Sequence, residues 1–125
     1  MRPYAMGSVN VAVKFGGVAA LKDTASQADI KKRVIDLRKK TTSELEAYGY
    51  DTIPSEANFF MLSVKGMTGP QVNKAMAAKK IMIAGHRWPE WENQVRVTVG
   101  TYEEMQKFNA ALAQVVQEGP PKATA

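Results

Sequence analysis

The 125-residue sequence predicts one α+β domain, in which helices pack against a small, largely antiparallel sheet. Three observations lead to this prediction. Two helical patterns fill the N-terminal part of the chain, and the later apolar segments follow in the order strand, helix, strand, strand and helix. A composition with 45% hydrophobic and 23% charged residues is typical of a folded globular protein.

Two helices are predicted first. Residues 8–23 carry apolar side chains at every third or fourth position, and Gly16 and Gly17 in the middle indicate close packing against another element. After a polar break at residues 23–26, the strongest helical pattern in the chain extends to Gly49, which is expected to end the helix because glycine adopts a positive φ at little cost. Its buried stripe is expected to contain Ile30, Val34, Leu37, Thr41, Leu45 and Tyr48.

A strand, a helix and a second strand follow. Residues 50–55 are expected to form a turn, and the continuous apolar run at residues 58–64 predicts a buried strand. A helix is expected over residues 70–80, because a proline stands at its start. The short apolar run at residues 81–84 is predicted to be the next strand.

The last strand and the last helix have the clearest local patterns. Valines alternate with Arg96 and Thr98 over residues 95–99, so these two side chains are expected to share the face opposite the valines. Thr101 and Glu104 then match a capping box, which predicts that a helix begins there and continues to about residue 118.

The net charge of +5 is concentrated in residues 31–40. This window contains one acid and six cations, namely Lys31, Lys32, Arg33, Arg38, Lys39 and Lys40. Apolar residues at helical spacing among them predict the solvated face of an amphipathic helix. A nucleic-acid-binding surface is the alternative, but no aromatic stacking platform accompanies the cations, so we expect no nucleic-acid partner.

The sequence also excludes several kinds of site. It contains no cysteine, which rules out disulfides, thiolate nucleophiles and cysteine-based zinc sites, and which fits a reducing compartment such as the cytoplasm. No apolar run is long enough to cross a bilayer, and the N-terminal residues do not resemble a signal peptide. We therefore expect a cytoplasmic chain with no membrane partner.

Two residues are candidates for binding on chemical grounds. His86 is the only histidine, and no second ligand or nucleophile stands at a known spacing from it, so it is either incidental or in contact with a ligand. Arg96 lies in the middle of a β-branched strand, where a guanidinium must find an anion or reach solvent. It is either a binding residue or a surface arginine on the open face of the sheet.

Two motifs give a more specific signal. The stretch Pro-Ser-Glu-Ala-Asn-Phe-Phe-Met at residues 54–61 is followed by Val-Arg-Val-Thr-Val-Gly-Thr-Tyr-Glu-Glu at residues 95–104. Together they resemble the C-terminal, small domain of class I/II aminotransferases that depend on pyridoxal 5'-phosphate (PLP), and in particular of the histidinol-phosphate type. The resemblance implies a junction and connecting helix over residues 1–24, the small domain over residues 25–118, and a disordered tail over residues 119–125.

The resemblance also implies roles for individual residues. Arg96 matches the arginine that holds the anionic group of the substrate in that family. Asn58 lies in the first motif and is a second candidate for substrate binding, although its amide can also serve the backbone at the strand entry. His86 is the third candidate. Residues 84–88 depart from the pattern of some histidinol-phosphate enzymes, so histidinol phosphate is only one possible substrate.

A complete enzyme of this kind would transfer an amino group between an amino acid or amine and a 2-oxo acid. The lysine that binds PLP covalently belongs to the large domain of the family, and none of the lysines here matches it, so this fragment alone is expected to bind no cofactor and to be inactive. The complete protein is expected to be a homodimer in which this part closes over the substrate. The alternative is a stand-alone, ferredoxin-like module that binds or senses a small ligand.

Overall fold

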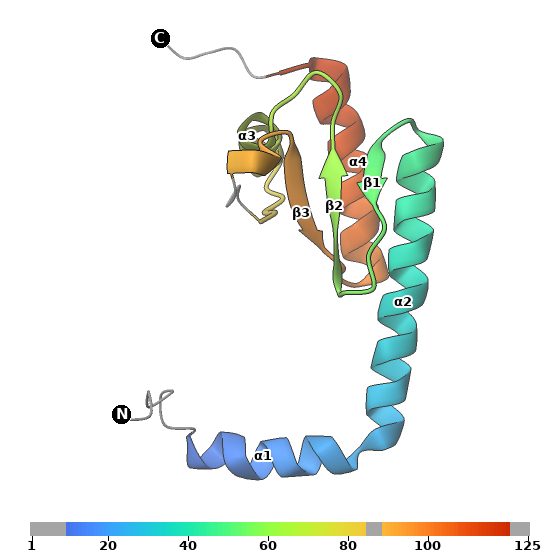
Figure 1. Ribbon diagram of the computed structural model, residues 1–125, viewed down its shortest axis with the longest axis vertical. Coiled ribbons are helices and arrows are strands. Elements are labelled where there is room, and N and C mark those ends of the chain that lie inside the picture. Colours follow the sequence, from blue (N-terminus) through green and yellow to red (C-terminus); the bar gives the residue numbers. More distant parts are fainter. Residues whose placement is uncertain (1–9, 85–88, 121–125) are drawn as a thin grey trace. The chain divides into compact units, whose positions relative to one another are not determined.

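A computed structural model describes residues 10–84 and 89–120. The chain divides into two compact units, Met1–Arg33 and Val34–Ala125. In chain order (Figure 1), the elements are α1 (Val11–Lys22), α2 (Thr24–Ala47), β1 (Asp51–Ile53), β2 (Phe59–Ser63), α3 (Gly69–Ala78), the 3-10 helix η1 (Pro89–Trp91), β3 (Gln94–Thr98) and α4 (Tyr102–Glu118).

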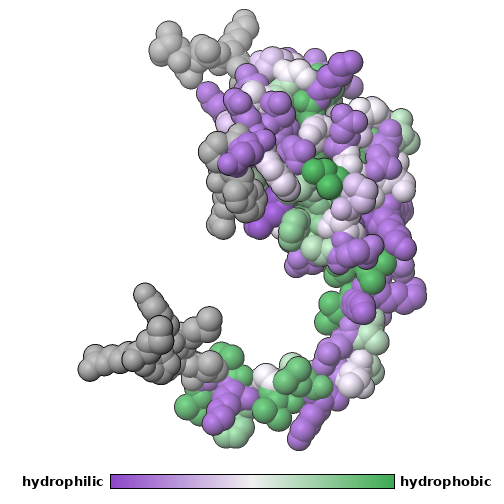
Figure 2. Space-filling view, in the orientation of Figure 1, coloured by the Kyte–Doolittle hydropathy of each residue, from purple (hydrophilic) through white to green (hydrophobic). Residues whose placement is uncertain are grey.

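The first unit contains α1, whose residues are all exposed. Figure 2 shows hydrophobic side chains along the surface of this helix. The predicted close packing at Gly16 and Gly17 is not found among the described residues, since no atom lies within 4 Å of a Cβ built at either position. The predicted break between the first two helices is confirmed but shrinks to Asp23, whose carboxylate accepts a hydrogen bond from the backbone N–H of Ser26 at 3.0 Å.

In the second unit, the C-terminal half of α2 contributes to the core. Thr41 and Leu45 are buried, which confirms the centre of the predicted stripe. Ile30 and Tyr48, the two ends of the predicted stripe, are exposed. Ile30 precedes the buried part of the helix, and Tyr48 follows the last helical residue. Gly49 has a φ of +83° just after the helix, as predicted for a residue that ends it.

The sheet is antiparallel, with its three strands in the order β1-β2-β3. Its inner face packs on the helices, and α4 runs behind it in Figure 1. Antiparallel register places inner residues opposite one another, as in the pairs Phe60 with Val97 and Leu62 with Val95. The core also includes Leu45, Val72, Met76, Phe108, Leu112 and Val115. This arrangement confirms the predicted α+β fold.

Two strand predictions need correction. Residues 81–84 do not form a strand: only Ala84 makes an isolated antiparallel bridge, in which its N–H donates to the carbonyl of Arg96 at 3.1 Å. Conversely, residues 51–53, which we expected in a turn, form the edge strand β1. The last residue of segment 81–84 still bridges to β3, which is where a split βαβ arrangement would place a strand. The chain enters this segment from α3 through Lys80, which has a φ of +62°.

Both helices that follow the first strands begin with capping boxes. At α4, Thr101 and Glu104 satisfy each other's backbone N–H groups, which confirms the prediction. At α3, Thr68 and Gln71 form the same motif. Helix α3 packs against α4 and β3, so these caps fix the ends of the two helices that close the core.

Candidate functional site

Arg96 lies in the middle of β3, on the open face of the sheet. Antiparallel register places it opposite Met61 on β2, and Met61 in turn lies opposite Ile53 on β1. Arg96 is half-buried and Thr98 is exposed, whereas the flanking valines are buried. The alternation predicted from the sequence is therefore confirmed, and it turns the guanidinium away from the core.

A pocket of about 540 Å³ opens at this position. Its lining residues come from the open sheet face, from the segment before β2 and from η1, and they are Ile53, Pro54, Ser55, Phe59, Met61, Glu90, Trp91 and Arg96. The lining is mainly apolar, with one guanidinium and one carboxylate. Small-molecule sites commonly combine an apolar wall with a few polar groups in this way.

The guanidinium of Arg96 contacts an aromatic ring, and its Nε–H has no hydrogen-bond partner among the described residues. Its Cζ lies 5.2 Å from the centroid of the Phe59 ring, which is within the range of a cation–π contact. Its Nε is buried and has no hydrogen-bond partner among the described residues. Glu90 is the other charged residue of the lining, and it does not satisfy this Nε–H in the described part of the chain. A buried N–H without a partner is costly, so an anion in the pocket would supply what Arg96 lacks.

The segment before β2 forms one wall of the pocket. The Ser55 hydroxyl accepts a hydrogen bond from the N–H of Ala57 at 3.1 Å and donates to the carbonyl of Phe59 at 2.5 Å. These two bonds fold residues 55–59 into a compact turn that leads into the strand. The Ser55 side chain thus holds the backbone of this wall at two points.

Asn58, the second predicted site residue, is not among the residues that line the pocket. The side chain of Asn58 is exposed, and its backbone carbonyl accepts a hydrogen bond from the N–H of Val99 at 2.9 Å. Asn58 therefore serves the strand entry through its main chain. His86 lies in residues 85–88, outside the described residues.

Arg38 corrects the prediction for the basic window. We expected its side chain on a solvated face, but that side chain is only 4% exposed. A signal for this burial is present in the sequence, since Arg38 stands at helical spacing between Val34 and Thr41 on the buried stripe. The neighbouring cations are exposed, and Arg33, for example, pairs with Asp29 at 2.7 Å on the helix surface.

Residues 10–84 and 89–120 contain neither a metal-binding cluster nor a membrane-spanning helix. No group of three or more His, Cys, Asp or Glu side chains in these ranges is placed to hold a metal ion. No helix there combines the length and the apolar character that crossing a bilayer requires.

Comparison with known proteins gives a consistent picture. The family model described as aminotransferase class I and II matches residues 9–112. Histidinol-phosphate aminotransferase 2 of Rhizobium meliloti is 31% identical over 105 residues, which cover 84% of this chain and 30% of that protein. Histidinol-phosphate aminotransferase of Marinomonas sp. is 32% identical over 99 residues, 78% of this chain and 28% of that protein.

A solved structure has the same fold. It is the histidinol-phosphate aminotransferase of Sinorhizobium meliloti in complex with pyridoxal-5'-phosphate, with a TM-score of 0.69 and 18% sequence identity, and the match covers 81% of this chain and 28% of that one. The chain therefore spans less than a third of the length of the relatives that it matches.

Proposed function

Because the chain belongs to the class I and II aminotransferase family, we propose that it is the small domain of a PLP-dependent aminotransferase and that Arg96 holds the anionic group of the substrate. The complete protein would transfer an amino group between an amino acid or amine and a 2-oxo acid. Histidinol phosphate is a candidate substrate, because the relatives described above are named histidinol-phosphate aminotransferases.

One observation supports the role of Arg96 most strongly. Its guanidinium points into an apolar pocket, is stacked on Phe59, and keeps a buried Nε–H without a partner among the described residues. A carboxylate or phosphate accepts two parallel hydrogen bonds from such a planar fork, and a lysine could not reproduce this geometry. The apolar wall would exclude water from the bound anion and so strengthen the interaction.

The pocket does not suit attachment of the cofactor itself. Covalent binding of PLP needs a lysine amine, and no lysine is found among the described residues that line the pocket. PLP, when bound, supplies an electron sink for carbanion chemistry. We assign its attachment to a large domain beyond this chain, and we assign to this chain the binding, orientation and desolvation of the substrate.

The same proposal divides the chain by role. Residues 1–24 would join the large domain to the small domain, and residues 25–118 would form the small domain. Most of the expected tail, residues 119–125, lies outside the described residues. The exposed apolar surface of α1 supports the first assignment, because a helix that is apolar all round is normally covered by other structure. We further propose that the small domain closes over the substrate in a homodimer.

The role of Arg96 is tested by Arg96→Ala and Arg96→Lys in the complete protein. We expect kcat/KM for an anionic amino donor to fall by about tenfold to a thousandfold, since charge-assisted hydrogen bonds are lost, while PLP binding, followed by its absorbance, persists. Arg33→Ala is the matched control, because it removes an exposed guanidinium. Unchanged kinetics for both Arg96 variants would overturn the assignment.

A second test separates the enzyme from a stand-alone binding module. An antibody against this chain would detect the native polypeptide in extracts of the source cells. A product several times larger than 13.7 kDa supports the aminotransferase, whereas a product of that mass would support the module.

A further inference from the structure

Arg38 ties α2 to the wall of the pocket, although it does not itself line the pocket. We propose that Arg38 is a positioning residue, which holds Phe59 beneath the guanidinium of Arg96 and thereby orients the anion-binding group. This inference rests on the proposed function of Arg96.

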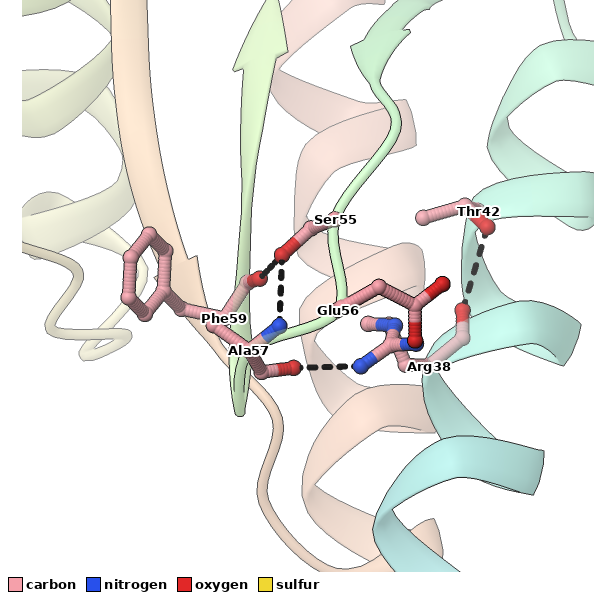
Figure 3. Close-up of polar contacts among 6 residues, drawn as sticks. All are labelled: Arg38, Thr42, Ser55, Glu56, Ala57 and Phe59. Carbon is pink, nitrogen blue, oxygen red and sulfur yellow. Dashed lines mark hydrogen bonds and ion pairs between the residues drawn. The ribbon is translucent and has the colours of Figure 1, made fainter.

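Among the described residues, both side-chain hydrogen bonds of Arg38 lead to the segment before β2. One terminal nitrogen donates to the carbonyl of Ala57 at 2.6 Å, and the other lies 3.0 Å from a carboxylate oxygen of Glu56. Figure 3 shows the side chain reaching from α2 to this segment. The carbonyl of Arg38 in turn accepts a hydrogen bond from the hydroxyl of Thr42 at 3.1 Å, so both ends of the residue are held.

A short relay continues from Ala57 to Arg96. The N–H of Ala57 donates to the Ser55 hydroxyl, and that hydroxyl donates to the carbonyl of Phe59 (Figure 3). The ring of Phe59 then lies under Arg96, with 5.2 Å between the guanidinium carbon and the ring centroid. These hydrogen bonds connect Ala57 to Ser55 and Ser55 to Phe59. A shift of the Ala57 backbone would therefore also move Ser55 and Phe59, which line the pocket.

The bond to the Ala57 carbonyl is the important contact of Arg38. The side chain of Glu56 is 92% exposed, so its attraction to Arg38 is screened by water and contributes little. The guanidinium is almost fully buried, and a charged group in that environment must be satisfied by hydrogen bonds. Removing it would therefore release the segment, whereas removing the charge of Glu56 would not.

Kinetics in the complete protein test the proposal. Arg38→Met should raise KM for an anionic amino donor by about tenfold to a hundredfold, because the pocket loses its pre-organised geometry. It should leave KM for an amine without an anionic group unchanged. A residue that only stabilises the fold would affect both substrates alike. Arg33→Met is the matched control at an exposed arginine, and we expect it to change neither value.

A second measurement does not depend on catalysis. The Nε–H resonance of Arg96, assigned in the 125-residue chain by its loss in Arg96→Lys, should carry a ring-current shift from Phe59. Ser55→Ala, which cuts the relay while keeping Arg38, should move this resonance toward the value of a free arginine, and so should Arg38→Met. Glu56→Gln should leave it in place.

The outcomes separate the two proposals. An Arg96 resonance that stays in place in both Ser55→Ala and a folded Arg38→Met would overturn the positioning role, and so would an unchanged KM for the anionic donor in Arg38→Met while Arg96→Lys raises it. If Arg96→Lys itself leaves that KM unchanged, the proposed function of Arg96 fails instead. The resonance then still decides whether the relay orients the guanidinium.

Discussion

Glu104 closes the N-terminus of α4. Its carboxylate accepts a hydrogen bond from the N–H of Thr101 at 2.7 Å, and the Thr101 hydroxyl accepts one from the N–H of Glu104 at 3.3 Å. The backbone and side-chain hydrogen bonds to Thr101 lower the pKa of Glu104 below its ordinary value of 4.5, and the positive charge of Lys107 adds to this effect. The ionised form of Glu104 is therefore favoured in the folded chain.

This lowered pKa predicts a pH-dependent contribution to stability. Because the folded pKa lies below the unfolded one, ionised Glu104 stabilises the fold above about pH 4.5, and this contribution is lost as the pH falls through the lowered folded pKa. Glu104→Gln keeps a capping side chain but cannot titrate. Urea unfolding as a function of pH should show the wild type gaining stability relative to Glu104→Gln as the pH rises, with the gain complete above pH 4.5. A difference independent of pH would contradict this, and Glu103→Gln is the control on the same helical turn.

At the residue level, the sequence predicts Arg96 better than Arg38. The position of Arg96 follows from a local pattern, since alternation along one strand decides which face a side chain occupies. The burial of Arg38 depends on a carbonyl 19 residues away, that of Ala57, which satisfies its guanidinium. Charge alone predicted a solvated side chain. The helical spacing of Arg38 indicates the buried stripe, but no local pattern reveals the carbonyl that satisfies its guanidinium.

At the level of the elements, Gly69 brings α3 close to the end of β3. A Cβ at this position would lie 2.6 Å from the carbonyl oxygen of Gln94 and 3.0 Å from that of Glu92, and the N–H of Gly69 donates to the Glu92 carbonyl at 2.7 Å. We expect Gly69→Ala to destabilise the fold by about 1–3 kcal/mol, because backbone atoms must move apart to admit the methyl group. Urea unfolding of the 125-residue chain measures this free energy.

Gly16→Ala is the matched substitution in open space. Apart from its own helix backbone and chain neighbours, no described residue has an atom within 4 Å of a Cβ there. Alanine favours a helix by about 1 kcal/mol over glycine, so helical content measured by circular dichroism should rise or stay constant. A loss of stability in Gly16→Ala equal to that in Gly69→Ala would show that contact with Gln94 and Glu92 is not the cause.

The strands show where prediction from sequence ends. Residues 81–84 form an apolar run, but the side chain of Met82 is 84% exposed and only Ala84 bridges to β3. Residues 51–53 have no strong local pattern and become a strand because β2 pairs with them, for example through Thr52 opposite Leu62. The helices and β3 were predictable because their periodicity is local. A strand without such a pattern, such as β1, depends on a partner distant in sequence.

At the level of the whole molecule, the two units differ in how their apolar residues are used. The second unit buries them in one core, which includes Phe60, Phe108 and Leu112. In α1, by contrast, Phe15 is 73% exposed and Leu21 is 75% exposed. An exposed apolar surface of this kind is normally covered by another part of the protein or by a partner. When the 125-residue chain is studied alone, we therefore expect α1 of the first unit to expose its apolar side chains to water.

The 125-residue chain on its own should therefore self-associate through α1. We expect its sedimentation coefficient to increase with concentration over the micromolar range, because association removes the apolar side chains of α1 from water. The double substitution Phe15→Ser and Leu21→Ser should abolish this dependence, whereas Lys14→Ser with Lys22→Ser, the control on the same helix, should not. In the complete protein, the double substitution Phe15→Ser and Leu21→Ser should lower the melting temperature, because the proposed large domain would cover α1. A chain that remains monomeric at every concentration, together with a complete protein indifferent to the double substitution, would show that α1 has no apolar partner.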